Sequence, residues 1–494
     1  MMRSSKQVAL LLILAMLAGM VTSCGSDTED QTALDMTETT KTTDTTQTED
    51  TLYELDDLPS DLNFGGATIT TLGREGLDAI EFFAEEMNGE LVNDAVYQRN
   101  LNVEERLGVK LEYVMKPGTY NDMAEWMGAV TSSVQAGDSA YDMVAGYSMA
   151  TASLAVQHAL MELNTLEYLN FDKPWWPDSL LTEATCANKL YVCSGDISTY
   201  MIYYMYGVYF NKDMITDYGL EDPYALVFDG TWTLDKMLEM STGIYQDLNG
   251  NGKKDGEDQF GYDCYNVFVD SLYFGVGLWT TDKADGDLPV LCAEFGGEKA
   301  HWLLETITEF MDTNDGLRTQ DGELDVNCRM FKEGRSLFSS NEFQYAALQL
   351  RDTEIGYGIL PVPKYDADQK GYRTVMSFPY SLYAIPVDVK DASMAAAVME
   401  ALASESYRTV TPALFETGMK VKYAQDDETS QVFDIIRSSA VFDFGRMFAK
   451  DMEWLTYSLF RYAPDSNWMS TYAKSEEKME TLLDTIVTAL VEGQ

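Results

Sequence analysis

The sequence has few histidines and few basic residues. Its 494 residues include two histidines, His158 and His301, and 34 Lys plus Arg against 81 Asp plus Glu, a formal net charge of −47. A surface of this charge repels nucleic acid and anionic lipid headgroups and disfavours anionic solutes. The shortage of histidine leaves few candidates for general acid–base catalysis. These shortages exclude nucleic-acid binding and argue against an enzyme.

Cysteine is also scarce, and its spacing excludes a paired-cysteine zinc site. An odd number of cysteines follows Cys24, so they cannot all pair within one chain, and none forms a CxxC pair. A turn expected at residues 188–189 makes Cys186 and Cys193 diagonal neighbours on two paired strands, too far apart for an easy disulfide bridge. We therefore expect free, buried thiols at Cys186, Cys193, Cys264, Cys292 and Cys328.

The first 60 residues do not have the pattern of a folded core. Residues 1–23 combine a basic start, an apolar run too short to span a bilayer as a mature helix, and small residues before Cys24, which predicts a secretory signal peptide. The last four residues, Val-Thr-Ser-Cys, resemble a bacterial lipobox, which implies cleavage and lipid attachment at Cys24. Residues 24–60 are acidic and rich in threonine, which predicts a disordered linker. We expect the protein on the extracellular face of the membrane, although an ordinary signal peptide with an incidental cysteine is the alternative.

Alternating apolar patterns predict the fold class after the linker. Helical patterns at 91–107, 121–135 and towards 160 separate strand patterns at 67–72, 109–114 and 141–145. This alternation predicts an α/β domain with a mainly parallel sheet. Ligands on such sheets bind at the carboxyl ends of the strands, here residues 73–75 and 146–148. The length indicates two or more lobes, and no second spacer separates them.

One acidic loop has the spacing of a calcium site. Residues 247–258 read Asp-Leu-Asn-Gly-Asn-Gly-Lys-Lys-Asp-Gly-Glu-Asp, with oxygen side chains at loop positions 1, 3, 5, 9 and 12 and glycine at position 6. This is the EF-hand pattern, in which calcium takes six to eight oxygen ligands. A polar turn without metal is the alternative. The predicted ligands of a structural calcium ion are Asp247, Asn249, Asn251, Lys253, Asp255 and Asp258.

The search for catalytic residues finds one weak candidate. Residues 146–150, Gly-Tyr-Ser-Met-Ala, approximate the nucleophile elbow of hydrolases at Ser148. The only later histidine is His301, which lies beside Trp302 on an amphipathic helical pattern. No spacing singles out a pair of carboxylates for glycoside hydrolysis. We therefore predict no enzymatic activity and keep a cell-surface hydrolase as an alternative.

Aromatic residues gather in two stretches that suit a sugar. Trp175 and Trp176 lie between two prolines, and several tyrosines crowd residues 200–206. Flat rings pack against the C–H faces of sugars, and carboxylates and amides bind the hydroxyl rims. The alternative for each ring is an ordinary place in the core.

From about residue 186 onward, the sequence contains five short motifs, and their order along the chain is informative. They are Asn-Lys-Leu-Tyr-Val at 188–192, Tyr-Phe-Asn-Lys-Asp-Met at 209–214, Gly-Thr-Trp-Thr-Leu-Asp at 230–235, Phe-Lys-Glu-Gly-Arg-Ser-Leu at 331–337 and Gly-Ile-Leu-Pro-Val-Pro at 358–363. Together they resemble the extracellular solute-binding proteins of family 1, the maltose-binding type, which serve carbohydrate ABC importers.

The resemblance implies a two-lobed, type II periplasmic-binding-protein-like α/β fold. Each lobe would have a mainly parallel sheet flanked by helices, with a hinge that closes on the solute and no catalysis. The expected partners are a small neutral solute, a mono- or oligosaccharide, and the ABC permease, and we expect a monomer. An adhesion or scaffold lipoprotein is a further alternative. The expected segments are 61–195 and 336–405 for lobe 1, and 196–335 and 406–494 for lobe 2.

The candidate ligand-binding residues come from three sources. The strand ends contribute Arg74 and Tyr147, and the aromatic loop contributes Trp176. The resemblance implies that the stretch before residue 210, the segment 341–345 and the segment 377–380 line the cleft. These segments contribute Asp196, Tyr200, Tyr204, Glu342, Phe343, Tyr345 and Tyr380.

Overall fold

The computed structural model describes residues 53–77, 80–284, 286–424, 426–462 and 468–492. The predicted signal peptide, Cys24 and the linker up to residue 52 lie outside the described residues. Residues Tyr53–Gln494 pack together as one unit. Within the described residues, no helix combines the length and the apolar character needed to cross a membrane.

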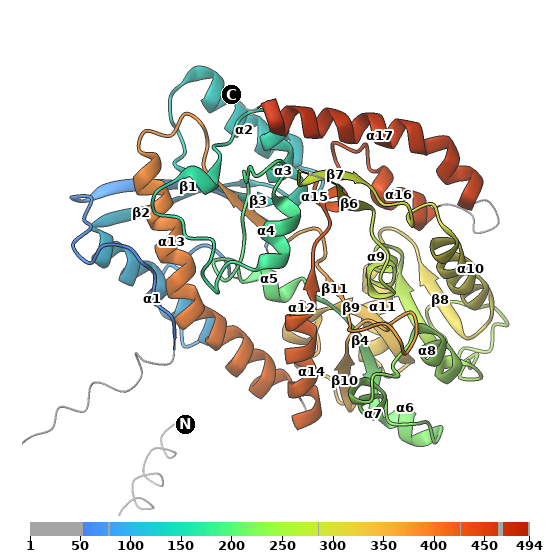
Figure 1. Cartoon of the computed structure of the whole chain (residues 1–494). Helices are drawn as coiled ribbons and strands as arrows, with labels where there is room; N and C mark the ends of the chain where they lie inside the picture. Colours follow the sequence, from blue (N-terminus) through green and yellow to red (C-terminus); the bar gives the residue numbers. More distant parts are fainter. Residues whose placement is uncertain (1–52, 78–79, 285, 425, 463–467, 493–494) are drawn as a thin grey trace, which may run out of the picture. The chain divides into compact units, whose positions relative to one another are not determined.

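The first sheet is built mainly from the N-terminal part of this unit (Figure 1). Its order is β12-β3-β1-β2, with β1, β2 and β3 parallel and β12 antiparallel to β3. The predicted alternation of strands and helices is confirmed here. The strands are β1 (Ala67–Glu75), β2 (Val109–Pro117), β3 (Met143–Tyr147) and β12 (Ser381–Ala384), and the flanking helices are α1 (Leu91–Leu107), α2 (Met123–Ala136), α3 (Ser148–Val156) and α13 (Ala392–Arg408).

The second sheet has the order β10-β4-β9-β5-β8. Strands β5, β8 and β9 are parallel, whereas β4 runs antiparallel to both β9 and β10, so this sheet is mixed. The strands are β4 (Tyr206–Asn211), β5 (Phe260–Tyr265), β8 (Gly316–Thr319), β9 (Ser336–Glu342) and β10 (Tyr357–Leu360), and helices near them include α8 (Leu234–Ser241), α10 (Glu298–Asp312), α11 (Leu324–Lys332) and α14 (Asp427–Ser438).

The assignment of chain segments to the two lobes differs in one place from the prediction. The sequence placed residues 336–405 in lobe 1, but β9 and β10 fall in this range and belong to the second sheet. The return to the first sheet comes later, at β12. A strand pattern does not reveal which of two sheets it joins, because that depends on pairing with strands far away in the sequence, 76 residues or more for β9.

Further elements lie between and after the strands of the two sheets. The helices among them are α4 (Asp178–Ala184), α5 (Tyr200–Tyr203), α6 (Lys212–Asp217), α7 (Pro223–Phe228), α9 (Val269–Gly275), α12 (Phe343–Leu348), α15 (Phe444–Met447), α16 (Leu455–Tyr462) and α17 (Trp468–Glu492). Small strand pairs are β6 (Thr281–Ala284) with β7 (Leu288–Leu291) and β11 (Thr374–Val375) with β13 (Ala440–Val441). Two 3-10 turns, Leu163–Thr165 and Asn266–Phe268, and a π-helix, Pro412–Tyr423, complete the described elements.

The core forms two clusters of buried side chains. One lies between the first sheet and helices α1 and α13 and includes Ile69, Val103 and Ala396. The other includes Leu72 and Trp126 at the first sheet and continues into the second sheet. Because this cluster is continuous, the two sheets are parts of one packed unit, and burial of apolar area stabilises them together.

The five cysteines after the linker are buried and free, as predicted. The turn near the first of them is one residue earlier than expected. Ala187 and Asn188 take positive φ angles of 50° and 62°, and Cys186 pairs with Lys189. Cys193 instead pairs with Tyr383 of β12. Burial raises the pKa of Cys186 to about 11, so its thiol is protonated at neutral pH.

Candidate functional site

The carboxyl ends of both sheets meet at a cluster of polar and aromatic side chains. Strands β1 and β3 end at Glu75 and Tyr147, and β9 ends at Glu342. The antiparallel strands begin at the same edges, since Ser381 of β12 pairs with Tyr147 and Tyr206 of β4 pairs with Glu342. These edges are where open α/β sheets bind ligands.

The first edge is shaped by glycine and tryptophan. Trp126 of α2 donates its indole N–H to the backbone oxygen of Gly73, at 3.0 Å. Its ring fills the space beside β3, where a Cβ atom on Gly146 would lie 2.4 Å from it. The absence of a side chain at residue 146 therefore lets α2 pack against the strand ends that carry Arg74 and Tyr147.

Arg74 is the central cation of this edge. Its side chain is 2% exposed, and its guanidinium carbon lies 5.6 Å from the ring centre of Tyr147 and 5.7 Å from that of Tyr200. The guanidinium donates to the backbone oxygen of Pro379 and, at 3.2 Å, to Ser381 Oγ. Arg74 thus joins β1 to the segment that leads into β12. Cation–π contacts of this kind gain strength where water is excluded.

The tyrosines before β4 connect this edge to the second sheet. The rings of Tyr200 and Tyr204 have centres 4.7 Å apart. The backbone N–H of Ser377 donates to the backbone oxygen of Tyr204 at 2.8 Å, and the Tyr206 hydroxyl donates to Ser377 Oγ at 3.2 Å. Tyr204, which follows α5, and Tyr206 of β4 therefore hold the segment that Arg74 contacts from the other side.

Glu342 is the acid of the second edge. It is 7% exposed and accepts a hydrogen bond from the side-chain amide of Gln344. Burial raises the pKa of Glu342 to about 7, and the hydrogen bonds from Ser377 and Gln344 offset only part of that rise. Burial, and then the negative charge of Glu342, raise the pKa of Tyr204 and of Tyr206, so these hydroxyls stay protonated and can donate.

The cluster contains charged residues that sequence reasoning missed. Asp270 of α9 forms ion pairs with both Arg446 of α15 and Arg461 of α16. Burial alone raises the pKa of Asp270, but the positive charges of Arg461 and Arg446 outweigh it and lower the pKa below its ordinary value. The one available signal was an aspartate inside the apolar stretch Val269–Gly275, since an acid there needs a partner.

Arg446 also holds the segment on which the two edges converge. Its guanidinium carbon lies 3.6 Å from the ring centre of Phe378, and it donates to the backbone oxygen of Met376 at 3.0 Å. Ser148 donates its hydroxyl to the backbone oxygen of Phe378 at 2.6 Å. Residues 376–379 are therefore bound by side chains from both sheets.

The predicted ligand-binding residues divide into two groups. Arg74, Tyr147, Tyr200, Tyr204 and Glu342 come together as described. Tyr380 lies beside them, with its backbone oxygen accepting from the N–H of Ser148 and its ring 5.8 Å from that of Phe442.

The other predicted residues lie in packed surroundings of their own. Trp176 donates its indole N–H to Glu400 at 3.0 Å under α13. Asp196 accepts from Thr411 at 2.8 Å and pairs with Arg437 at 3.2 Å. The ring of Phe343 packs on Phe433, and the hydroxyl of Tyr345 donates to the backbone oxygen of Cys328. The sequence alone could not show that these residues have partners outside the cluster.

The acidic loop at 247–258 curls back on its own polar groups. The carboxylate of Asp247 accepts the backbone N–H groups of Gly250 and Gly252, at 2.7 and 2.8 Å, and both glycines have φ angles of 69°. The side-chain amides of Asn249 and Asn251 donate to Asp255, at 3.2 and 2.8 Å.

The last acid of this loop lies at its base. Asp258 is fully buried, and its carboxylate accepts the hydroxyl of Tyr245 at 3.1 Å and the backbone N–H of Leu248 at 3.3 Å. Across the described residues, no group of three or more His, Cys, Asp or Glu side chains is arranged to hold a metal ion. Calcium also binds the oxygens of asparagine amides and of backbone carbonyls. Both kinds of oxygen are present in this loop, and neither belongs to a His, Cys, Asp or Glu side chain.

The weak catalytic candidate does not assemble into a triad. Ser148 is fully buried, and its hydroxyl donates its hydrogen bond to the backbone oxygen of Phe378. His301 lies on α10, and its buried Nδ1 atom has no hydrogen-bond partner in the described part of the chain. A hydrolase would need these two side chains to share a hydrogen bond.

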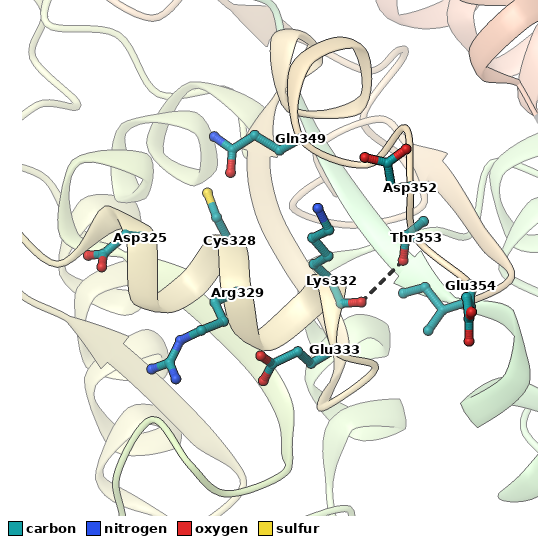
Figure 2. A pocket seen from close by; sticks show the side chains of 10 residues that line it. Asp325, Cys328, Arg329, Lys332, Glu333, Gln349, Asp352, Thr353 and Glu354 are labelled. Carbon is teal, nitrogen blue, oxygen red and sulfur yellow. Dashed lines mark hydrogen bonds between the residues drawn. The ribbon is translucent and has the colours of Figure 1, made fainter. Parts of the chain in front are cut away.

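A surface pocket of about 510 Å³ lies beside α11, away from the cluster (Figure 2). Its wall includes charged side chains of α11 and of residues 349–355, among them Arg329, Lys332 and Asp352. Thr353 donates its hydroxyl to the backbone oxygen of Lys332 at 3.1 Å. None of the predicted ligand-binding residues lines this pocket, so it is a feature of the second sheet's flank.

Comparison with known proteins gives structural matches without sequence matches. No family model matches the chain, and the search of curated proteins found no match. Among solved structures, the chain is similar to a cyclo/maltodextrin-binding protein complexed with maltotetraose, with a TM-score of 0.54 and 14% identity over 86% of this chain and 97% of the other.

Two further solved structures agree with this one. The GacH receptor of Streptomyces glaucescens, solved unliganded and with acarbose, has a TM-score of 0.52 and 14% identity over 87% of this chain and 100% of its own. An ABC transporter solute-binding protein of Thermotoga lettingae, bound to α-D-tagatose, has a TM-score of 0.51 and 14% identity over 85% and 100%. The chain therefore has the α/β periplasmic-binding-protein fold, with two mixed sheets flanked by helices, as the resemblance implied.

Proposed function

We propose that this protein is a solute-binding protein that captures a saccharide and delivers it to an ABC transporter. The observation that carries the proposal is the meeting of the carboxyl ends of both sheets at Arg74, Tyr147, Tyr204 and Glu342. The aromatic rings suit the apolar faces of a sugar, and the hydrogen-bond donors and acceptors suit its hydroxyl groups. The similar structures named above are described with maltotetraose, acarbose and tagatose.

The proposed action is binding and release without chemical change. The side chains of the cluster are buried, so a solute reaches them when the two sheet edges separate. Solute binding then shifts the population towards the state in which both edges contact it. The acidic composition by itself favours a neutral solute.

Calorimetric titration of the purified chain with mono- and oligosaccharides tests this function. We expect saturable binding to at least one saccharide, with no product formed. Tyr204→Ala should weaken it at least about 10-fold, because the variant removes a buried ring from the cluster. Tyr218→Ala is the matched control, since Tyr218 lies outside the cluster and contacts Gln246. Binding only to peptides or amino acids, or turnover of a glycoside, would contradict the proposal.

Lipid anchoring through Cys24 is part of the same proposal. The lipobox resemblance at residues 21–24 supports it, and a tethered position would keep the protein near its permease. We expect the full-length protein to fractionate with membranes and Cys24→Ala to fractionate with soluble proteins. Mass spectrometry of the N-terminal peptide should show the lipid on Cys24. An unmodified Cys24 in the mature protein would refute the anchor.

We also propose a structural calcium ion at residues 247–258. The donor chemistry fits: Asp247, Asn249, Asn251, Asp255 and Asp258 offer oxygens, and Lys253 offers its backbone carbonyl. The amide N–H groups of Asn249 and Asn251 now face Asp255, so ion binding requires both amides to rotate and present oxygen.

Calorimetry on chelator-treated protein tests the calcium proposal. We expect one calcium site, stabilising the fold by an amount that grows with calcium concentration. Asp247→Ala should abolish it. Glu257→Gln is the matched control, because Glu257 lies in the loop at a position without a ligand role and pairs with Arg329. Equal calcium binding by both variants would contradict the assignment.

A further inference from the structure

Two buried guanidinium groups in the cluster each have an unused donor. Arg74 Nε and Arg446 Nε are buried and have no hydrogen-bond partner among the described residues. Both side chains are at least nine-tenths buried, Arg74 at 2% and Arg446 at 5% exposure. A buried charged donor without an acceptor is costly, so such groups call for an explanation in a missing ligand or water.

The two arginines converge on the same short segment. Arg74 donates to the backbone oxygen of Pro379, while Arg446 stacks on the ring of Phe378 and donates to the backbone oxygen of Met376. The positive charges of both, and of Arg461, lower the pKa of Tyr147, although burial dominates and raises it. One solute group placed at Tyr147 is therefore within the electrostatic reach of all three arginines.

The carboxylates nearby do not fully compensate these arginines. Asp270 alone pairs with both Arg446 and Arg461. Within the described residues, no carboxylate forms an ion pair with Arg74; Glu81 reaches it through Ser381, whose hydroxyl donates to Glu81 at 2.8 Å. Burial raises the pKa of Glu81, although Arg74 opposes that rise, and it raises the pKa of Glu342 to about 7, which reduces the negative charge of Glu342 near neutral pH. Among the described residues, one carboxylate therefore serves two of the arginines, and Arg74 has no carboxylate in direct contact.

We propose that the solute is an acidic saccharide whose carboxylate binds between Arg74 and Arg446. This inference rests on the proposed saccharide-binding function and adds the charge of the solute. A carboxylate accepts two hydrogen bonds and matches the planar donors of guanidinium groups. The remaining hydroxyls of the sugar meet Tyr204, Glu342 and the side-chain amide of Gln344, whose Oε1 atom is also buried without a partner among the described residues.

The acidic surface does not oppose this assignment. Its charges are exposed and are screened over about 8 Å at physiological ionic strength, whereas the arginines act at contact distance in a buried site. We therefore expect the buried arginines to select the acidic saccharide. The acidic surface should slow the association of this saccharide with the protein at low salt, and added salt should make the association faster.

Matched solutes and variants test the proposal. The probes are D-galacturonate and trigalacturonate against D-galactose and galactotriose, titrated calorimetrically into the full chain, with sodium sulfate as an anion without a sugar. Arg74→Gln keeps an N–H donor for Pro379 but removes the charge, and Arg74→Lys keeps the charge. Arg329→Gln removes an exposed cation distant from the cluster and is the control. Thermal unfolding of each variant verifies that it is folded.

We expect the acidic probes to bind at least about 10-fold more tightly than the neutral ones. Arg74→Gln should weaken the acidic probes about 10- to 100-fold and the neutral ones less than about threefold, and Arg74→Lys should recover most of the loss. Preference for neutral sugars, or an equal loss for both kinds in Arg74→Gln, would overturn the inference and leave the saccharide function standing.

Two other outcomes are also decisive. Sulfate that binds as tightly as galacturonate and depends on Arg74 equally would show an inorganic anion site and overturn the acidic saccharide. If no saccharide binds, in this set or in the wider titration described above, the proposed function fails and the inference fails with it.

Discussion

The arginine and tyrosine cluster and the acidic loop at 247–258 are two polar regions built in opposite ways. The loop takes all its oxygens from twelve consecutive residues and is exposed over most of its length. The cluster takes its charged groups from residues as far apart as Arg74, Asp270 and Arg461 and buries them. Exposed polar groups can replace a lost partner with water at little cost in free energy. Buried charged groups have no water to replace a partner, so they depend on every partner being present.

The largest expected effect comes from removing the shared carboxylate of the cluster. Asp270→Ala leaves two buried arginines without their partner and should lower the free energy of unfolding by about 3–5 kcal/mol. Asp247→Ala in the loop, without calcium, should cost no more than about 1 kcal/mol. Urea unfolding followed by circular dichroism measures both. Equal losses for the two variants would remove the distinction between the regions.

The next effect is a pH dependence that belongs to Glu342. Its folded pKa of about 7 is above the unfolded value, so its contribution to stability is full below about pH 4.5 and is lost as the pH rises through 7. From pH 5 to pH 8 the wild type should lose about 2 kcal/mol more than Glu342→Gln. Comparison with the variant is needed because Glu183 and Glu400, also with pKa values of about 7, titrate in the same range. Parallel pH profiles of wild type and variant would contradict the assignment.

A smaller effect separates packing from binding among the aromatic residues. Trp176→Phe removes the hydrogen bond to Glu400 and should lower the free energy of unfolding by about 1–3 kcal/mol. Saccharide affinity should stay within about twofold, because the ring lies under α13 and not at the sheet edges. Unfolding and calorimetric titration of the same preparation measure both quantities. A large loss of affinity in a variant of normal stability would place Trp176 in the site after all.

The smallest effect is expected at the surface. Arg329 pairs with Glu257 at 2.9 Å, but about half of each side chain is exposed. Because exposed ion pairs contribute little, Arg329→Gln should change the free energy of unfolding by less than about 1 kcal/mol. A change as large as that of Asp270→Ala would mean that exposure does not govern the strength of ion pairs in this protein.

Much of the fold could be read from the chain. The parallel strands and helices of residues 67–156 appear within a few residues of their predicted places, because apolar periodicity there is local. The lobe assignment of β9 and β10 could not be predicted in this way, since a strand pattern does not name its partner strand.

The sequence by itself determined an α/β chain with an excess of acidic residues and free thiols, and it predicted a secretory signal and an EF-hand-like calcium loop. Tertiary structure decided which side chains meet. It brought Arg74, Tyr147, Tyr204 and Glu342 together, placed Trp176 and Asp196 elsewhere, and added the ion pairs of Asp270. The reason is physical: periodicity and motifs record interactions between near neighbours, whereas a buried cluster depends on contacts between segments hundreds of residues apart.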